Sequence, residues 1–205
     1  MADRFVREHL TNTEEFWTPF PLPSVAANDP LFRNAPENNW GGQCEGLTYQ
    51  RAILALERYG YEPLVTALGR KLLAALIRGG CVFTQQFDPF TGEPSRVGMV
   101  SHAVLRPGSD EPFQDSYGPK MLAALEYIAH IWGVHIQMGE VWFSLGHSAA
   151  PYRYEQRWGK HVYLVESDGS RATVIADGKP LGSYDCGVRI IADESGRVLR
   201  VRPIE

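Results

Sequence analysis

Apolar and polar positions follow a helical period in three segments of the first two thirds of the chain. The spacing predicts helices over 49–59, 63–78 and 119–132, and the short connection between the first two is typical of a helical hairpin. Gly60 and the pair Gly79–Gly80 are expected to end the first two helices. Glu57 is assigned to the solvent-facing side of the first helix. The other two helices are apolar on most sides, which predicts that neighbouring elements cover them.

After Gly139 the pattern changes to short β-rich runs that are separated by glycine-containing turns. The runs cover 141–145, 152–158, 161–166, 171–177, 187–193 and 197–203. Such regular short runs predict an antiparallel meander or small sandwich. The arginines of the last two runs are expected on solvent-facing sides; they are Arg189, Arg197, Arg200 and Arg202. We therefore predict an α+β fold, with a helical region over 1–138 and an antiparallel β domain over 139–205.

Charge and composition exclude several functional classes. The 205 residues include 20 Lys and Arg against 24 Asp and Glu, a net charge of −4, so no nucleic-acid partner is expected. No apolar run approaches the roughly 18 residues of a membrane helix, and the N-terminal residues are too polar for a secretory signal. The three cysteines are too few and too scattered for a disulfide framework. A cytoplasmic location without membrane association is the expectation.

Two segments concentrate polar and aromatic side chains on either side of the predicted hairpin. In 38–46, amides, adjacent glycines and a carboxylate surround Trp40 just before a helix. An indole beside amides and acids is common in sugar-binding sites, although a tightly packed helix start with a core tryptophan also explains this composition. In 83–93, the run around Asp88 is consistent with a structural turn in which Asp88 caps the loop amides.

In combination, these segments resemble the late part of the catalytic (α/α)6 barrel of six-hairpin glycoside hydrolases. This group contains trehalases, processing α-glucosidases and mannosylglycerate-hydrolase-like enzymes. Its Trp-Gly motif opens an inner helix that ends in Tyr-Gly, as in 39–42 and 58–60 here. Its acidic motif, close to Glu-x-(Tyr/Phe)-(Asp/Asn)-Pro-x-Thr-Gly, is matched by 85–92. Residues 116–119 look like the start of the next inner helix and 16–24 like a substrate-side loop, so the resemblance covers 15–135.

The resemblance implies inverting hydrolysis of a glycosidic bond, with a carbohydrate as ligand and no cofactor. Gln85 occupies the motif position of the general base, where an amide can orient water or a sugar hydroxyl but cannot take up a proton. The acid of the resembled enzymes, normally an Asp on an earlier hairpin, has no matching motif here. Asp88 and Glu45 are the nearest carboxylates that can substitute. The candidate catalytic residues are therefore Gln85, Asp88 and Glu45, and the candidate substrate-binding residues are Trp17, Trp40, Gly41, Gln43 and Tyr117.

The length of the chain bears on whether it acts alone. The twelve helices of such a barrel with their connections need more than about 250 residues, whereas three or four helices are predicted here. We therefore expect the C-terminal portion of an inverting glycosidase, with weak or no activity by itself, or a non-catalytic carbohydrate-binding subunit. A homo-oligomer or a partner chain that completes the barrel would cover the apolar helices.

Two other kinds of site were weighed against this interpretation. In a thiol hydrolase, Cys44 at a helix N-terminus would be the nucleophile, His102 the base, and Asp110 or Asp115 the orienting group. The residues after Cys44 lack the small and aromatic run of papain-like enzymes. No metal site is expected, because no two histidines have helical i, i+3 or i, i+4 spacing. His130 and His135 are ascribed to packing or capping.

Overall fold

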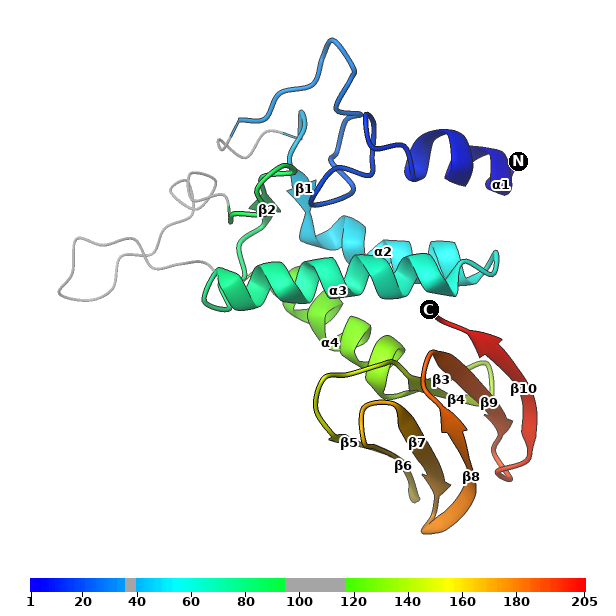
Figure 1. Ribbon diagram of the computed structural model, residues 1–205. Helices are drawn as coiled ribbons and strands as arrows, with labels where there is room; N and C mark the ends of the chain where they lie inside the picture. Colours follow the sequence, from blue (N-terminus) through cyan, green and yellow to red (C-terminus); the bar gives the residue numbers. More distant parts are fainter. Residues whose placement is uncertain (36–39, 95–116) are drawn as a thin grey trace, which may run out of the picture. The chain divides into compact units, whose positions relative to one another are not determined.

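The computed structural model describes residues 1–35, 40–94 and 117–205. The chain divides into two units, and three helices contribute residues to both (Figure 1). Unit 1 comprises Met1–Ala55 and Arg70–Ala124, and unit 2 comprises Leu56–Gly69 and Leu125–Glu205. No helix in the described ranges is long and apolar enough to cross a membrane.

The three predicted helices are present. They are α2 (Gly46–Glu57), α3 (Glu62–Arg78) and α4 (Gly118–Trp132). A short helix, α1 (Ala2–Phe5), runs directly into a π-helical turn, η1 (Val6–Leu10), which the sequence pattern did not predict. Gly60 and Gly80 follow α2 and α3 with φ of 81° and 73°. This left-handed conformation ends helices and costs glycine little, so the two glycines mark the ends as expected.

Unit 1 contains a small antiparallel strand pair that joins the two polar segments. Strands β1 (Cys44–Glu45) and β2 (Gln86–Phe87) place Glu45 opposite Gln86, 41 residues later in the chain. Aromatic rings pack beside this pair: the Phe20 ring centroid lies 5.2 Å from that of Tyr49 and 4.8 Å from that of Phe87. All three rings are buried, so the strand pair is held by a local core.

Unit 2 contains two four-stranded antiparallel sheets, in the orders β10-β9-β4-β3 and β5-β6-β7-β8. A buried core draws on both, with Phe143 and Ile190 from the first sheet and Val165 and Val174 from the second. The predicted α+β fold class is thereby confirmed. The strands are β3 (Val134–Gln137), β4 (Glu140–Leu145), β5 (Tyr152–Trp158), β6 (His161–Ser167), β7 (Arg171–Ala176), β8 (Lys179–Asp185), β9 (Val188–Asp193) and β10 (Val198–Pro203).

Two of these strands were not predicted, and both lie at the edges of their sheets. β8 contains Pro180 and Gly182, residue types that weaken the β signal but that an edge strand tolerates. β3 follows directly on the helical pattern and has only four residues. The β region of the fold therefore begins at Val134, while the domain boundary near residue 138 stays a prediction.

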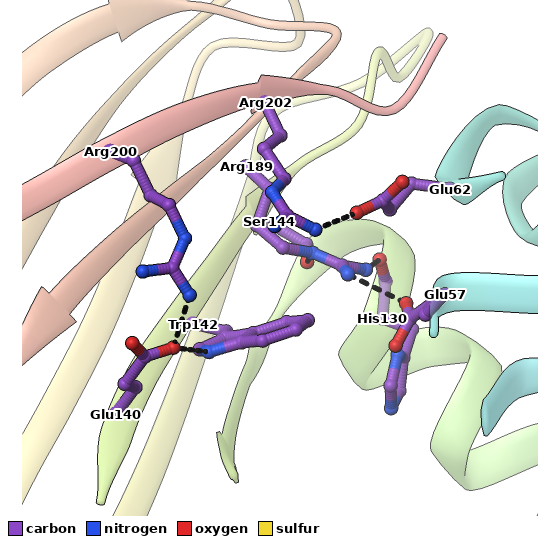
Figure 2. A network of polar contacts seen from close by, with 9 residues as sticks. All are labelled: Glu57, Glu62, His130, Glu140, Trp142, Ser144, Arg189, Arg200 and Arg202. Carbon is purple, nitrogen blue, oxygen red and sulfur yellow. Dashed lines mark hydrogen bonds and ion pairs between the residues drawn. The ribbon is translucent and has the colours of Figure 1, made fainter. Parts of the chain in front are cut away.

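Two charged residues that were expected to face solvent are instead buried inside unit 2. Arg189 and Glu57 expose 1% and 4% of their surface, and Arg189 Nη1 donates to Glu57 Oε1 at 2.6 Å. Figure 2 shows this ion pair beside a second one, in which Arg202 Nη1 donates to Glu62 Oε1 at 2.7 Å. The solvent-facing assignment of both residues was wrong because each charge is neutralised by a partner 132 positions away in the sequence.

Candidate functional site

The paired strands of unit 1 carry a cluster of buried polar side chains. Glu45, Gln86 and Lys120 expose 1%, 2% and 0% of their surface. Gln86 Nε2 donates a hydrogen bond to Glu45 Oε1. Lys120, from the first turn of α4, places Nζ 3.1 Å from Thr84 Oγ1. A Cβ atom at position 46 would lie 2.6 Å from the Lys120 Cβ, so only glycine at this position lets α4 approach so closely.

Burial shifts the protonation of the two charged members of this cluster. Burial raises the pKa of Glu45, against the opposing effects of the Gln86 and Gln85 amides and of the Lys120 charge. Burial also lowers the pKa of Lys120 to about 6, although the charge of Glu45 opposes this shift. A carboxyl group with a raised pKa is suited to donate a proton near neutral pH.

Three oxygen atoms in this region are buried without a hydrogen-bond donor among the residues that the structure describes. They are Gln43 Oε1, Glu45 Oε2 and Gln86 Oε1. The two amide oxygens are acceptors in every protonation state. Leaving a buried acceptor unpartnered costs about 1–3 kcal/mol, so the arrangement favours a ligand that brings several donors, such as the hydroxyl groups of a sugar.

Asp88 holds the loop that follows β2. Its Oδ1 accepts hydrogen bonds from the backbone N–H groups of Phe90 and Thr91, at 2.8 and 3.0 Å. Its Oδ2 accepts a third from Asn34 Nδ2 at 2.7 Å. Partial burial opposes ionisation, but these hydrogen bonds keep the pKa of Asp88 below its ordinary value. The contacts support a structural role for Asp88, and its role as a catalytic base stays a prediction.

Gln85 and Tyr117 lie close to Glu45, as their effects on pKa show: Gln85 influences the pKa of Glu45, and Glu45 influences that of Tyr117. A hydrogen bond with the Gln85 amide lowers the pKa of Glu45 and so opposes the effect of burial. Burial, together with the negative charge of Glu45, raises the pKa of the Tyr117 hydroxyl. The Tyr117 backbone N–H donates to the Phe83 carbonyl at 2.8 Å, which fixes the start of α4 beside the 83–93 segment. The structure therefore brings these two predicted residues to the Glu45 cluster.

The other predicted binding residues lie at different depths. Gln43 is buried, and its Nε2 donates to Asn34 Oδ1 at 3.3 Å, which links it to the partner of Asp88. Trp40 is 56% exposed. Ser24 connects the backbone of Trp40 to that of Gln43: its Oγ donates to the Trp40 carbonyl, and its N–H donates to the Gln43 carbonyl. The carbonyl of Gly41 accepts from the backbone N–H of Arg33.

Trp17 is half-buried in the N-terminal loop, where its backbone N–H donates to the Asn12 carbonyl at 2.9 Å. Hydrogen bonds within the described ranges do not connect it to Glu45. Gln86 and Lys120 are the members of the cluster that were not among the predicted site residues, although Gln86 lies in the polar 83–93 segment. The signal for Lys120 was weaker: a single lysine within the first turn of a helix that is otherwise apolar on most sides.

The thiol-hydrolase alternative depends on a reactive Cys44. This thiol is fully buried and donates to the Phe20 carbonyl, with Sγ 3.2 Å from the oxygen. Burial, and then the negative charges of Asp88 and Glu45, raise its pKa well above the ordinary value, which is the opposite of what a thiolate nucleophile needs. The proposed partners His102, Asp110 and Asp115 lie outside the described residues.

The structure thus places a buried acid among glutamine amides in unit 1. In the comparison with protein families, the model of the mannosylglycerate hydrolase MGH1-like glycoside hydrolase domain matches residues 2–108. The chain belongs to this family, and the predicted resemblance is confirmed. The matched range contains Glu45, Gln85 and Asp88. No curated protein matches the chain.

Proposed function

We propose that this chain supplies the carbohydrate-binding part of an inverting glycosidase site, as the C-terminal portion of such an enzyme. Glu45 would be its proton donor. The observation that carries this proposal is the environment of Glu45: a buried carboxyl whose pKa is raised by burial, beside amide oxygens that have no donor in the described part of the chain. Membership of a glycoside hydrolase domain family supports a carbohydrate as the ligand.

In the proposed reaction, the protonated carboxyl of Glu45 gives its proton to the glycosidic oxygen as the bond to the anomeric carbon breaks. Water attacks that carbon from the opposite face and loses a proton to a base. The Oε1 atoms of Gln43 and Gln86 accept hydrogen bonds from sugar hydroxyls. The exposed ring of Trp40 offers a stacking surface, and Gln85 orients a hydroxyl or the attacking water.

The mechanism also requires a base. Inverting enzymes place a carboxylate about 6.5–9.5 Å from the acid to leave room for the water. Asp88 is ionised, but three hydrogen bonds already occupy its oxygen atoms. We therefore propose that the second carboxylate comes from a partner chain, and that this chain alone has weak or no turnover.

A non-catalytic carbohydrate-binding role is the second candidate. It is favoured by Gln85, because the residue at the position of the general base in the resembled motif is an amide that cannot take up a proton. The two candidates predict the same binding site. They differ in whether Glu45 is needed for anything besides affinity.

Calorimetric titration tests this proposal, with mannosylglycerate, trehalose and maltose as probes. We expect the chain to bind at least one of them and Gln43→Leu to weaken that binding by roughly tenfold, because one hydrogen bond contributes about 0.5–1.5 kcal/mol. Gln156→Leu, a glutamine on β5, is the matched control and should bind like the unmodified chain. Glu45→Gln should still bind and should lose whatever residual hydrolysis the unmodified chain shows. Absence of binding to all three, or unchanged affinity of Gln43→Leu, would count against the proposal.

A further inference from the structure

Three potential metal ligands from distant parts of the sequence meet inside unit 2. Glu57 ends α2, His130 lies in the last turn of α4, and His135 is in β3. One ligand atom from each lies within 4.8 Å of the other two. The two imidazole rings stack with their centroids 3.7 Å apart and their planes inclined by 20°. Glu57 and His130 are buried, with exposed fractions of 4% and 7%.

This cluster contains polar atoms that no described residue satisfies. Glu57 Oε2 and both ring nitrogens of His135 are buried and have no hydrogen-bond partner within residues 1–35, 40–94 and 117–205. A neutral imidazole has one N–H donor and one acceptor nitrogen, so His135 forgoes both of its hydrogen bonds. Each unsatisfied group costs about 1–3 kcal/mol. A single bound ion between Glu57 Oε2 and a nitrogen of His135 would satisfy two of these atoms at once.

The surrounding side chains hold the ligands in place, as Figure 2 shows for Glu57 and His130. Arg189 Nη1 and His130 Nδ1 both lie close to Glu57 Oε1, at 2.6 and 2.8 Å, which leaves Oε2 unoccupied. Arg189 also donates to the His130 carbonyl at 2.9 Å and to Ser144 Oγ at 3.0 Å. Outer contacts of this kind orient the ligands of metal sites.

We propose that Glu57, His130 and His135 bind one Zn²⁺ ion. Two imidazole nitrogens and one carboxylate oxygen match the ligands of open zinc sites, whereas Ca²⁺ and Mg²⁺ require mostly oxygen ligands. Zinc bonds of about 2.0–2.2 Å need the ligand atoms at most about 4.4 Å apart. A ring nitrogen binds a metal in the plane of its ring, so one of the two stacked imidazoles must turn out of the stack on binding. The positive charge of Arg189 balances the negative charge of Glu57. The site with Zn²⁺ bound would therefore have a net charge of +2, as in three-histidine zinc sites.

A groove lies beside His135, one of the three proposed ligands. It has a volume of about 260 Å³ and is lined by His135 together with residues of α4 and β5, among them Leu125, Tyr154 and Trp158. Spacing along the chain did not reveal the cluster because Glu57 precedes His130 by 73 positions. The two histidines alone are five residues apart and span the end of a helix.

Zinc stoichiometry tests the proposal. The full chain would carry Cys81→Ser, because Cys81 is an exposed free cysteine and thiolates are zinc ligands. After removal of metal with a chelator and equilibration with Zn²⁺, we expect one ion per chain. Co²⁺ in its place should show the visible absorption bands of a four-coordinate site with nitrogen ligands. His135→Phe keeps a ring for stacking but removes both nitrogens, and should weaken zinc binding by at least about tenfold.

His161→Phe is the matched control, because His161 is a partly exposed histidine that contacts Asp177 at 2.8 Å and lies outside the cluster. Its zinc affinity should equal that of the parent. A parent chain without bound Zn²⁺, or a folded His135→Phe variant with unchanged affinity, would overturn the proposal. The stoichiometry and cobalt spectrum of the parent decide the question where His135→Phe fails to fold.

Discussion

Arg189→Met is expected to lower the free energy of unfolding by about 3–5 kcal/mol, the range for removing one partner of a buried ion pair. Arg189 is 1% exposed and donates to Glu57, to Ser144 and to a backbone carbonyl. Without the guanidinium, burial still disfavours the ionised form of Glu57, and His130 is then the remaining described group that stabilises the charge. Urea unfolding at pH 7 of chelator-treated protein, followed by tryptophan fluorescence, measures the effect.

Two further variants separate the charge effect from packing. Adding Glu57→Gln to Arg189→Met removes the uncompensated charge, so the double variant should recover part of the lost stability. Arg197→Met breaks an exposed pair with Asp193, where 76% of the Arg197 side chain is in solvent, and should change stability by less than about 1 kcal/mol. If Arg189→Met unfolded within about 1 kcal/mol of the parent, the buried pair would not have the structural role assigned to it.

Lys120→Met is expected to stabilise the fold at pH 7 by an amount on the order of 4 kcal/mol. The pKa of Lys120 is lowered from 10.5 to about 6 in the folded chain, chiefly by burial. Between these two values the unfolded chain holds one proton more than the folded chain. Stability from this group therefore rises with pH over that range. Methionine has a similar shape and can still pack on the Phe87 ring, so the variant should lack this rise.

The measurement is urea unfolding at several pH values between 6 and 10, with the difference between variant and parent as the readout. The difference should be largest near pH 6 and close to zero near pH 10. Lys179→Met, at an exposed lysine in β8, should show no comparable trend. A Lys120→Met variant that is less stable than the parent at pH 7 would show that the amine is stabilising as placed. A buried amine that lowers stability is typical of a residue kept for a site.

Periodicity and turn residues predicted most of the fold. The helices α2, α3 and α4 and six of the strands follow from spacing that is visible within each segment, and Gly60 marks a helix end as expected. Elements with weak local signals were missed: β8 contains Pro180, and its position at a sheet edge becomes clear only once the sheet is assembled. The burial of Arg189 and Glu57 was missed for a related reason, since their pairing is a long-range contact.

The candidate site was predicted in part. The two polar segments on either side of the hairpin suggested Glu45 and Gln85, and the structure brings them together through a strand pair of only two residues each. No local pattern indicated that Lys120 would reach this pair, because that contact depends on Gly46 and the start of α4. The loop-capping role of Asp88 was foreseen from the turn chemistry of Asp-Pro followed by Thr-Gly.

The central claim is that a carbohydrate binds beside Glu45. It is tested most directly by ¹⁵N NMR of the side-chain amide and indole signals during titration with the glycoside that binds in calorimetry. We predict saturable shifts of the Gln43, Gln85 and Gln86 amides and of the Trp40 indole, with the Trp158 indole of β5 unchanged. Shifts confined to Trp158 and the rest of unit 2, with the three glutamine amides unmoved at saturation, would contradict the assignment of the site.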